Sequence, residues 1–339
     1  MSKENKIKKK TKKKGSVMWG LIYVFTFIIA FSGSVAFKIK YNPFGKEFSV
    51  DWNDSVGTVH TDLSYGSGEA NKFDLYVPAD DSRENYGLIV YLHAGGFTGG
   101  DKSGDVEILE WLCSKGYVTA GINYTLFSEK NPDANVYRQS VEIKESMSYV
   151  IAEAEKLGYH INEMSIGGGS AGHALAMIYA YRDADDSPVP VKMTFGAVGP
   201  SCFYVEDWIN MGTNPDNPVP FDPNGDYQGI ADLLYVMSGN EITNNMFKTG
   251  EYKESVKNIS AEMWIKENSV PTVVAYGSWD RVQPFSASLK LKQALENNGI
   301  DHQYFEMKHS GHGLQNDSRM YAQYMRKVLE YLDTYMPVK

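Results

Sequence analysis

Short apolar runs alternate with helix-patterned stretches along most of this chain, and this alternation restricts the possible folds more than any other feature. Residues 88–92 (LIVYL) are continuously apolar, as expected of a strand that is covered on both faces. Residues 143–154 carry apolar side chains at the spacing of one helix face. Alternating strands and helices predict an α/β fold, with a mostly parallel central sheet and helices on both of its faces.

The same patterns divide the rest of the chain into elements. Strands are expected over 72–77, 88–92, 117–122, 164–166, 193–198, 272–276 and 303–307, and helices over 108–113, 143–158, 171–181, 286–297 and 320–335. The first of these strands alternates apolar and polar residues, which predicts a half-exposed edge strand.

One region interrupts the alternation of strands and helices. Residues 201–270 are rich in Asn, Pro, Gly and aromatic residues and contain no strand pattern. We expect an irregular insertion that caps the site rather than a second domain. The main folded domain is therefore predicted to span residues 55–339, with the cap insertion at about 201–270.

The N-terminal part of the chain has the composition of a targeting segment. Residues 1–16 are a basic tail, and residues 17–37, from Val17 to Phe37, contain no charged residue. At ~1.5 Å per residue such a helix spans the ~30 Å core of a bilayer. Two outcomes stay open: an uncleaved transmembrane anchor, or a signal peptide cleaved after Ala36.

Either outcome has the same consequence for location. A lysine-rich flank stays in the cytoplasm, so the body of the protein is predicted to be extracytoplasmic, either membrane-anchored or secreted. Residues 38–54 are expected to be a short spacer between this segment and the folded domain.

The rest of the chain is acidic and poor in cysteine. Outside residues 1–15 there are 25 basic and 41 acidic residues, which argues against nucleic acid as a partner. Cys113 and Cys202 cannot form a disulfide framework, and no CxxC or HExxH pattern indicates a zinc site. Two buried thiols are expected, and a disulfide between them stays open. The sequence leaves the oligomeric state open.

Residues 166–172 (IGGGSAG) join a predicted strand to a predicted helix and contain the pattern G-x-S-x-G. Gly168 and Gly172 leave room for a sharp turn that exposes Ser170 at the N-terminus of the helix. The stretch also matches G-x-G-x-x-G, the pattern of a dinucleotide site. Such a site needs an acidic residue at the end of the next strand, where Gly199 follows instead, so this alternative is disfavoured.

The loop after the apolar strand has residues suited to anion binding. Residues 93–97 (HAGGF) contain two glycines that allow backbone N–H groups to point into a cleft and bind an oxyanion. His93 is expected to brace this loop rather than to transfer protons.

Two further loops complete a set of catalytic side chains. Asp280 follows one predicted strand, and His312, between two glycines, follows the last one. A serine needs a base to accept its proton, and the base needs a carboxylate that fixes its tautomer. His309 is the competing histidine, and a structural role is expected for it.

These motifs and their order along the chain resemble the α/β-hydrolase superfamily, in particular the esterase/lipase group of hormone-sensitive-lipase-like and feruloyl-esterase-like carboxylesterases. The resemblance covers residues 56–337. It is carried by 73–78 (FDLYVP), 93–97 (HAGGF), 121–124 (GINY), 170–172 (SAG), 280–284 (DRVQP) and 312–313 (HG).

The resemblance implies an α/β-hydrolase fold and an oxyanion hole formed by the N–H groups of Gly95, Gly96 and Ala171. The chain departs from the family pattern at two positions. Ala94 replaces the first glycine of an HGGG pattern, and His173 stands where a glycine often follows the nucleophile turn. We expect His173 to alter the mouth of the pocket.

We therefore predict a serine hydrolase that cleaves carboxylic esters of small-molecule substrates through an acyl-enzyme. Ser170 attacks the ester, His312 moves the proton and Asp280 orients His312. No cofactor or metal is expected. Polar, turn-forming runs in the cap predict that short acyl chains are favoured. The alternatives are a peptidase of the same fold and a non-catalytic binding module.

Overall fold

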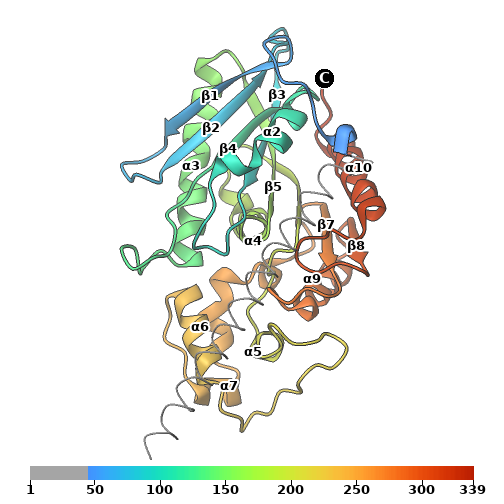
Figure 1. Cartoon of the computed structure of the whole chain (residues 1–339). Coiled ribbons are helices and arrows are strands. Elements are labelled where there is room, and N and C mark those ends of the chain that lie inside the picture. Colours follow the sequence, from blue (N-terminus) through green and yellow to red (C-terminus); the bar gives the residue numbers. More distant parts are fainter. Residues whose placement is uncertain (1–44) are drawn as a thin grey trace, which may run out of the picture. The chain divides into compact units, whose positions relative to one another are not determined.

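The computed structural model describes residues 45–339 of the chain (Figure 1). The predicted basic tail, the apolar segment 17–37 and the first part of the spacer lie outside the described residues. Residues 48–339 form one compact unit, the second of two along the chain, and this unit contains the predicted catalytic domain, residues 55–339. Within residues 45–339 no helix is both long enough and apolar enough to cross a bilayer.

An eight-stranded sheet forms the centre of the second unit, in the order β1-β2-β4-β3-β5-β6-β7-β8. Strand β1 pairs antiparallel with β2, and β2 pairs antiparallel with β4, whereas the other neighbouring strands are parallel. The predicted, mostly parallel sheet is confirmed. The strands are β1 (Gly57–Ser64), β2 (Lys72–Pro78), β3 (Tyr86–Leu92), β4 (Val118–Ile122), β5 (Ile161–Gly169), β6 (Val191–Ala197), β7 (Thr272–Gly277) and β8 (His302–Met307).

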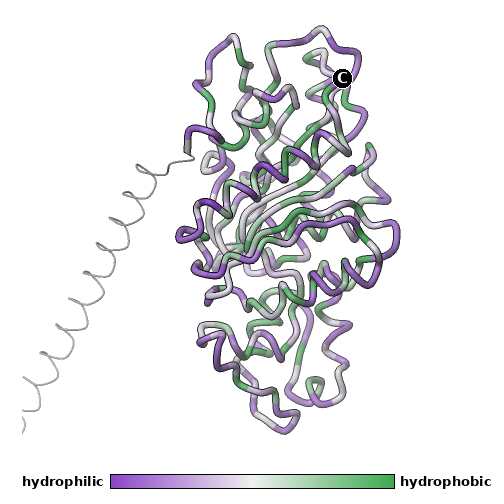
Figure 2. Tube along the Cα trace, turned by 90° about the vertical axis from the view of Figure 1, so that its right-hand side faces the viewer, coloured by the Kyte–Doolittle hydropathy of each residue, from purple (hydrophilic) through white to green (hydrophobic). Residues whose placement is uncertain are grey.

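Helices cover both faces of this sheet, as predicted (Figure 1). One core lies between the sheet and α3 (Val136–Lys156), α4 (Ala171–Ile178) and α9 (Phe285–Asn297). The opposite face packs against α2 (Val106–Cys113) and α10 (Ser318–Tyr335). In Figure 2 the hydrophobic residues follow the central strands, and hydrophilic residues lie on the outer helices and loops.

Strand β3 shows why a central strand is apolar throughout. Its residues Leu88, Val90 and Leu92 contribute to the first core, and Ile89 contributes to the second. Successive side chains of a strand point to opposite faces of the sheet, so both sets of positions are buried here.

The short elements connect these layers. Helix α4 continues into a π-helical turn, η3 (Tyr179–Asp183). The 3-10 turns are η1 (Gly45–Phe48), η2 (Lys102–Asp105), η4 (Ala184–Asp186), η5 (Lys257–Ile259) and η6 (Ala261–Trp264).

The prediction of an edge strand at residues 72–77 is wrong. Strand β1, which the sequence patterns did not indicate, takes the edge position, and β2 is buried at six of its seven residues. Strand β1 contains few apolar residues, and its pairing with β2 is interrupted between His60 and Leu63. The alternation of side chains between the two faces of β1 is therefore interrupted, and no alternating pattern appears in the sequence.

The insertion between β6 and β7 contains no strand, as predicted, but much of it is helical rather than irregular. Its helices are α5 (Val205–Trp208), α6 (Gln228–Ser238), α7 (Asn244–Thr249) and α8 (Tyr252–Val256). Helices this short gain their stability from tertiary packing, which periodicity does not reveal. Leu234 of α6 and Phe247 of α7 join the core that also contains α3.

A buried lysine connects the edge of the sheet to the loop after β3. The Lys102 Nζ lies 3.0 Å from Asp74 Oδ1 on β2 and 2.8 Å from Asp62 Oδ1 on β1. The side chains of Lys102 and Asp74 are 7% and 6% exposed, whereas that of Asp62 is 73% exposed. Burial alone would lower the pKa of Lys102, but the two carboxylates raise it above its ordinary value.

We predict that Lys102→Met lowers the free energy of unfolding by about 3–5 kcal/mol, because the Asp74 carboxylate then stays buried without its counter-charge. Asp62→Asn is the matched control, since asparagine tolerates the positive φ of residue 62 and an exposed ion pair contributes less than about 1 kcal/mol. Urea denaturation measures the free energy of unfolding of both variants. Equal losses for the two variants would contradict this account.

Candidate active site

The turn between β5 and α4 holds Ser170 in an unusual backbone conformation, with φ 52° and ψ −119°. Few residues other than glycine adopt a positive φ, and such strain concentrates at functional sites. The Ser170 N–H donates to Ala197 O on β6 (2.8 Å), and Ser170 O accepts from Ala174 N in α4 (3.0 Å). Neighbouring elements therefore hold the turn at both ends.

Two glycines make this turn possible. A Cβ on Gly168 would lie 2.5 Å from the carbonyl carbon of Gly172, and a Cβ on Gly172 would lie 1.9 Å from Leu92 O at the end of β3. Backbone atoms of packed elements cannot move aside, so only glycine fits at either position. The G-x-S-x-G spacing thus corresponds to a steric requirement of the turn.

Ser170, His312 and Asp280 form a continuous hydrogen-bonded chain. Ser170 Oγ lies 2.8 Å from His312 Nε2, and His312 Nδ1 lies 2.7 Å from Asp280 Oδ2. A carboxylate only accepts, so Nδ1 carries the proton and Nε2 is the acceptor for the serine hydroxyl. The three residues follow β5, β7 and β8, at the carboxyl ends of parallel strands, where sites of α/β sheets form.

The Asp280 carboxylate is held in place by hydrogen bonds within its own loop. The Asp280 side chain is fully buried, and its Oδ1 accepts from the N–H groups of Val282 (2.8 Å) and Gln283 (3.2 Å). Its Oδ2 is the oxygen that bonds to His312. The orientation of His312 is thereby coupled to the turn after β7.

The loop after β3 contains three consecutive residues with positive φ. Gly95, Gly96 and Phe97 have φ values of 140°, 61° and 66°. Among residues 45–339, no group accepts a hydrogen bond from the N–H groups of Gly95, Gly96 and Ala171. Ala171 is the first residue of α4, where helical geometry leaves N–H groups unpaired. These three donors are thus available to a ligand.

His93 has the contacts of a brace. Its ring stacks on Tyr124, with a centroid distance of 4.3 Å, and its Nδ1 lies 2.8 Å from Ala94 O. The Tyr124 hydroxyl donates to His93 O (2.9 Å), and burial lowers the pKa of His93. These contacts connect the end of β3 to the segment after β4.

The expectation that His173 alters the mouth of the pocket is wrong. His173 is fully buried, and its Nδ1 accepts from Gly199 N (3.1 Å). Burial lowers its pKa to about 3, so the ring is neutral. A Cβ on Gly196 would lie 2.3 Å from the ring, so glycine on β6 is what accommodates it. Distance from Ser170 along the sequence did not reveal which face of α4 carries His173.

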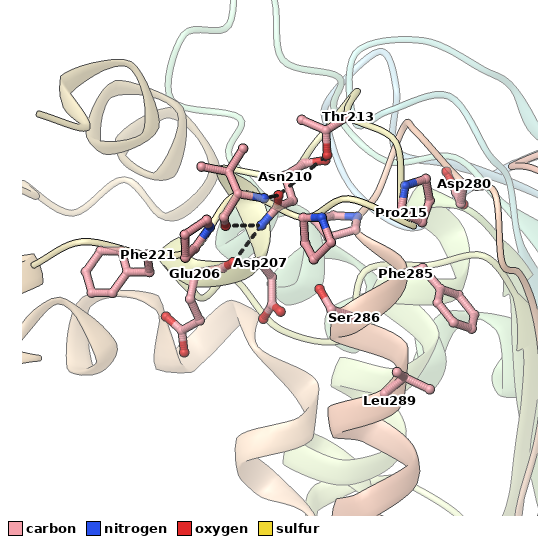
Figure 3. A pocket seen from close by; sticks show the side chains of 14 residues that line it. Glu206, Asp207, Asn210, Thr213, Pro215, Phe221, Asp280, Phe285, Ser286 and Leu289 are labelled. Atoms are coloured by element: carbon pink, nitrogen blue, oxygen red, sulfur yellow. Dashed lines mark hydrogen bonds between the residues drawn. The ribbon is translucent and has the colours of Figure 1, made fainter. Parts of the chain in front are cut away.

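Residues of the insertion and of α9 line an open cavity of about 440 Å³, which Asp280 also borders (Figure 3). Pro215, Phe221, Phe285 and Leu289 form much of its apolar wall, and Ser170 and His312 are not among its lining residues. The insertion therefore borders the loop that carries Asp280.

Two acidic residues at this cavity are engaged by a lysine of α9. The Lys290 Nζ lies 3.2 Å from Glu206 Oε1 and 2.5 Å from Asp207 Oδ2. Asn210 holds the adjacent loop, because its side chain accepts from Val219 N (2.6 Å) and donates to Val219 O (3.1 Å).

The two cysteines do not pair with each other. Cys113 and Cys202 are both buried free thiols, as expected, and burial raises the pKa of each, that of Cys113 to about 12. Within residues 45–339 no group of His, Cys, Asp and Glu side chains is arranged to hold a metal ion.

The sequence matches one family model, named BD-FAE, over residues 73–295. Two curated relatives are kynurenine formamidases. The protein from Salmo salar is 33% identical over 119 residues, which are 34% of this chain and 37% of that protein. The protein from Danio rerio is 30% identical over 139 residues, 40% of this chain and 44% of that protein. The matched part is thus less than half the length of either relative.

Solved structures with a similar fold include several esterases. A carbohydrate esterase from gut microbiota aligns with a TM-score of 0.63 and 18% identity, covering 84% of this chain and 98% of that one. Est2 of Thermogutta terrifontis aligns with a TM-score of 0.62, 18% identity and coverage of 84% and 95%. Esterase B of Lactobacillus rhamnosis aligns with a TM-score of 0.60, 16% identity and coverage of 92% and 96%. At these identities the matches establish the fold.

We predict that Gly172→Ala prevents the turn at Ser170 from forming, because the added Cβ overlaps Leu92 O. The melting temperature should fall, as expected for about 1–3 kcal/mol of overpacking or more, and Ser170 should lose its reaction with a fluorophosphonate probe. Gly104→Ala is the matched control, since a Cβ there meets nothing within 4 Å. Labelling of the Gly172 variant at the wild-type rate would argue against the steric explanation.

Proposed function

The chain belongs to the BD-FAE family and is an α/β-hydrolase of the carboxylesterase class, and from that premise we propose that it cleaves small carboxylic esters through an acyl-enzyme. The observation that carries the proposal is the hydrogen-bonded chain from Ser170 through His312 to Asp280, with distances of 2.8 Å and 2.7 Å. A serine is a weak nucleophile without a base, and this geometry supplies one.

In the proposed reaction Ser170 Oγ attacks the ester carbonyl carbon while its proton passes to His312 Nε2. Asp280 stabilises the resulting imidazolium. The N–H groups of Gly95, Gly96 and Ala171 donate to the negative oxygen of the tetrahedral intermediate. Collapse of this intermediate breaks the bond to the alcohol, which leaves with the proton from His312.

The second half of the reaction repeats these steps with water. His312 removes a proton from water, and the oxygen attacks the acyl-enzyme carbonyl carbon. The bond to Ser170 Oγ then breaks, and the proton on His312 returns to that oxygen. The acid is released, and the free enzyme is restored without a cofactor.

Short acyl chains are the preferred substrates in this proposal. The Est2 structures include complexes with butyrate and propionate, and esterase B has a structure with a C4-C4 tributyrin phosphonate inhibitor. In this chain, the residues 214–218 (NPDNP) and 222–226 (DPNGD) of the insertion are polar and mostly exposed, unlike the apolar surface that a long acyl chain needs.

Formamides are a second candidate substrate class. Both curated relatives described above are kynurenine formamidases. Formyl is the smallest acyl group, and the same serine, histidine and carboxylate can cleave an amide as well as an ester.

We also propose that the enzyme is extracytoplasmic, through residues 17–37 acting as an anchor or a signal peptide. The uncharged run of residues 17–37 after a lysine-rich tail supports this location. N-terminal sequencing of the protein from its native cell distinguishes the two, and recovery of the intact chain in the cytoplasm would contradict both.

We predict that Ser170→Ala eliminates ester turnover except for the residual ~10³–10⁴-fold acceleration that binding and the oxyanion hole retain. The substitution removes one oxygen from a partly exposed residue, so the melting temperature should change little. Steady-state hydrolysis of p-nitrophenyl acetate and fluorophosphonate labelling measure the effect. Turnover close to wild type by the pure variant would overturn the assignment of the nucleophile.

We predict that kcat/KM for acetyl to butyryl esters exceeds that for dodecanoyl esters by roughly tenfold or more, a difference within the range that apolar contacts of a few methylenes supply. An acyl series of p-nitrophenyl esters, with N-formyl and N-acetyl anilides as the amide arm, gives the ranking. A maximum at twelve carbons or beyond would contradict the preference for short chains.

A further inference from the structure

The loop that carries His312 is closed by a carboxylate at the start of α10. Asp317 is the N-cap residue of this helix, yet its side chain makes no hydrogen bond to the first turn. Aspartate is among the preferred N-cap residues because its oxygens usually accept from those N–H groups. Here both carboxylate oxygens point back to the beginning of the loop.

The contacts of Asp317 join the two ends of the segment 309–317. Its Oδ1 lies 2.8 Å from His309 Nδ1, and its Oδ2 accepts from Ser310 Oγ (2.6 Å) and His309 N (3.0 Å). In addition, Asn316 N donates to Ser310 Oγ (3.0 Å), and Asn316 Nδ2 donates to His309 O (2.7 Å). His312 lies between these two closed ends.

The beginning of the segment 309–317 also contacts the loop that carries Asp280. Ser310 is fully buried, and its carbonyl oxygen accepts a hydrogen bond from the N–H group of Trp279 (3.0 Å). Trp279 is the residue before Asp280. A Cβ on Gly277 would lie 2.3 Å from Gly311 O, so the two loops are in close backbone contact. Any shift of Ser310 would therefore change how His312 meets Asp280.

The charge of Asp317 strengthens its hydrogen bonds to His309 and Ser310. Its side chain is 12% exposed, whereas that of His309 is 79% exposed. Partial burial would raise the pKa of Asp317, but hydrogen bonds from Ser310 and His309 lower it, so the carboxylate is ionised near neutral pH. Hydrogen bonds to an ionised acceptor are about twice as strong as those between neutral groups.

We propose that Asp317 is a positioning residue for the ester hydrolysis proposed above: it closes the loop 309–317 and thereby holds His312 Nε2 within hydrogen-bond distance of Ser170. It acts through Ser310 and His309 and contacts no reacting atom. The inference rests on the proposed function, since it concerns the same base. It assigns a purpose to a carboxylate that the helix itself does not use.

Two substitutions separate this role from helix capping. Asp317→Ser keeps a residue that caps helices well but removes the carboxylate, whereas Asp317→Ala removes both possibilities. A positioning role predicts that kcat falls about tenfold or more in both variants, with KM changed less than about twofold. A capping role alone predicts a wild-type kcat for Asp317→Ser. Asp317→Asn keeps one acceptor oxygen and should recover part of the loss.

A second readout reports the position of His312 without turnover. The proton on His312 Nδ1, in its hydrogen bond to Asp280, gives a low-field proton resonance that should weaken or shift in Asp317→Ser. Asp333→Ser, on the exposed surface of the same helix, is the control and should leave the resonance and kcat unchanged. An unchanged resonance and kcat in Asp317→Ser would overturn the proposal.

The same experiment keeps the two proposals apart. If the wild-type protein shows no hydrolysis that depends on Ser170, the proposed function is wrong, and the resonance still decides whether Asp317 positions His312. If the wild type is active and Asp317→Ser has the wild-type resonance and the wild-type kcat, the positioning role is wrong and the proposed function stands.

Discussion

The contact between α4 and the end of β3 determines where most groups of the site lie. Gly172 packs so closely on Leu92 that even one methyl group would overlap the carbonyl oxygen. This contact sets the start of α4 beside the loop that begins at His93, so the Ala171 N–H and the N–H groups of Gly95 and Gly96 can converge. It also requires the positive φ of Ser170, which directs Oγ toward His312. The strained serine and its proposed anion-binding donors are therefore consequences of a single packing constraint.

The sequence patterns predicted the features that depend on the periodicity of apolar residues and on the steric needs of short segments. These features can be recognised because each produces a pattern within a short stretch of sequence. They are the continuously apolar strands, the amphipathic helices α3 and α10, and the glycines around Ser170. The three side chains of the hydrogen-bonded chain were found for the same reason, since each follows a strand and has glycine or turn residues beside it. Their roles in catalysis remain predictions, whereas their proximity is a feature of the structure.

The features that were missed depend on contacts between distant parts of the chain. Strand β1 has no clear alternation, and the short helices of the insertion are stabilised by packing on the core that contains α3. The direction of His173 depends on Gly196 and Gly199, which lie on another strand and its loop. Asp317 looks like an ordinary helix cap in the sequence, and only the fold of the loop shows that its oxygens serve His309 and Ser310.

The position of β8 at the edge of the sheet gives Ser170 and His312 unequal structural support. Ser170 follows β5, which has a neighbouring strand on each side, whereas His312 follows β8, which within residues 45–339 pairs with β7 alone. Edge elements open at a lower free energy than central ones, often as a cooperative unit with the helix that covers them. Separation of β8 and α10 from the sheet would withdraw His312 and leave the turn at Ser170 folded. The proton transfer proposed for His312 would then stop well below the temperature at which the remaining sheet unfolds.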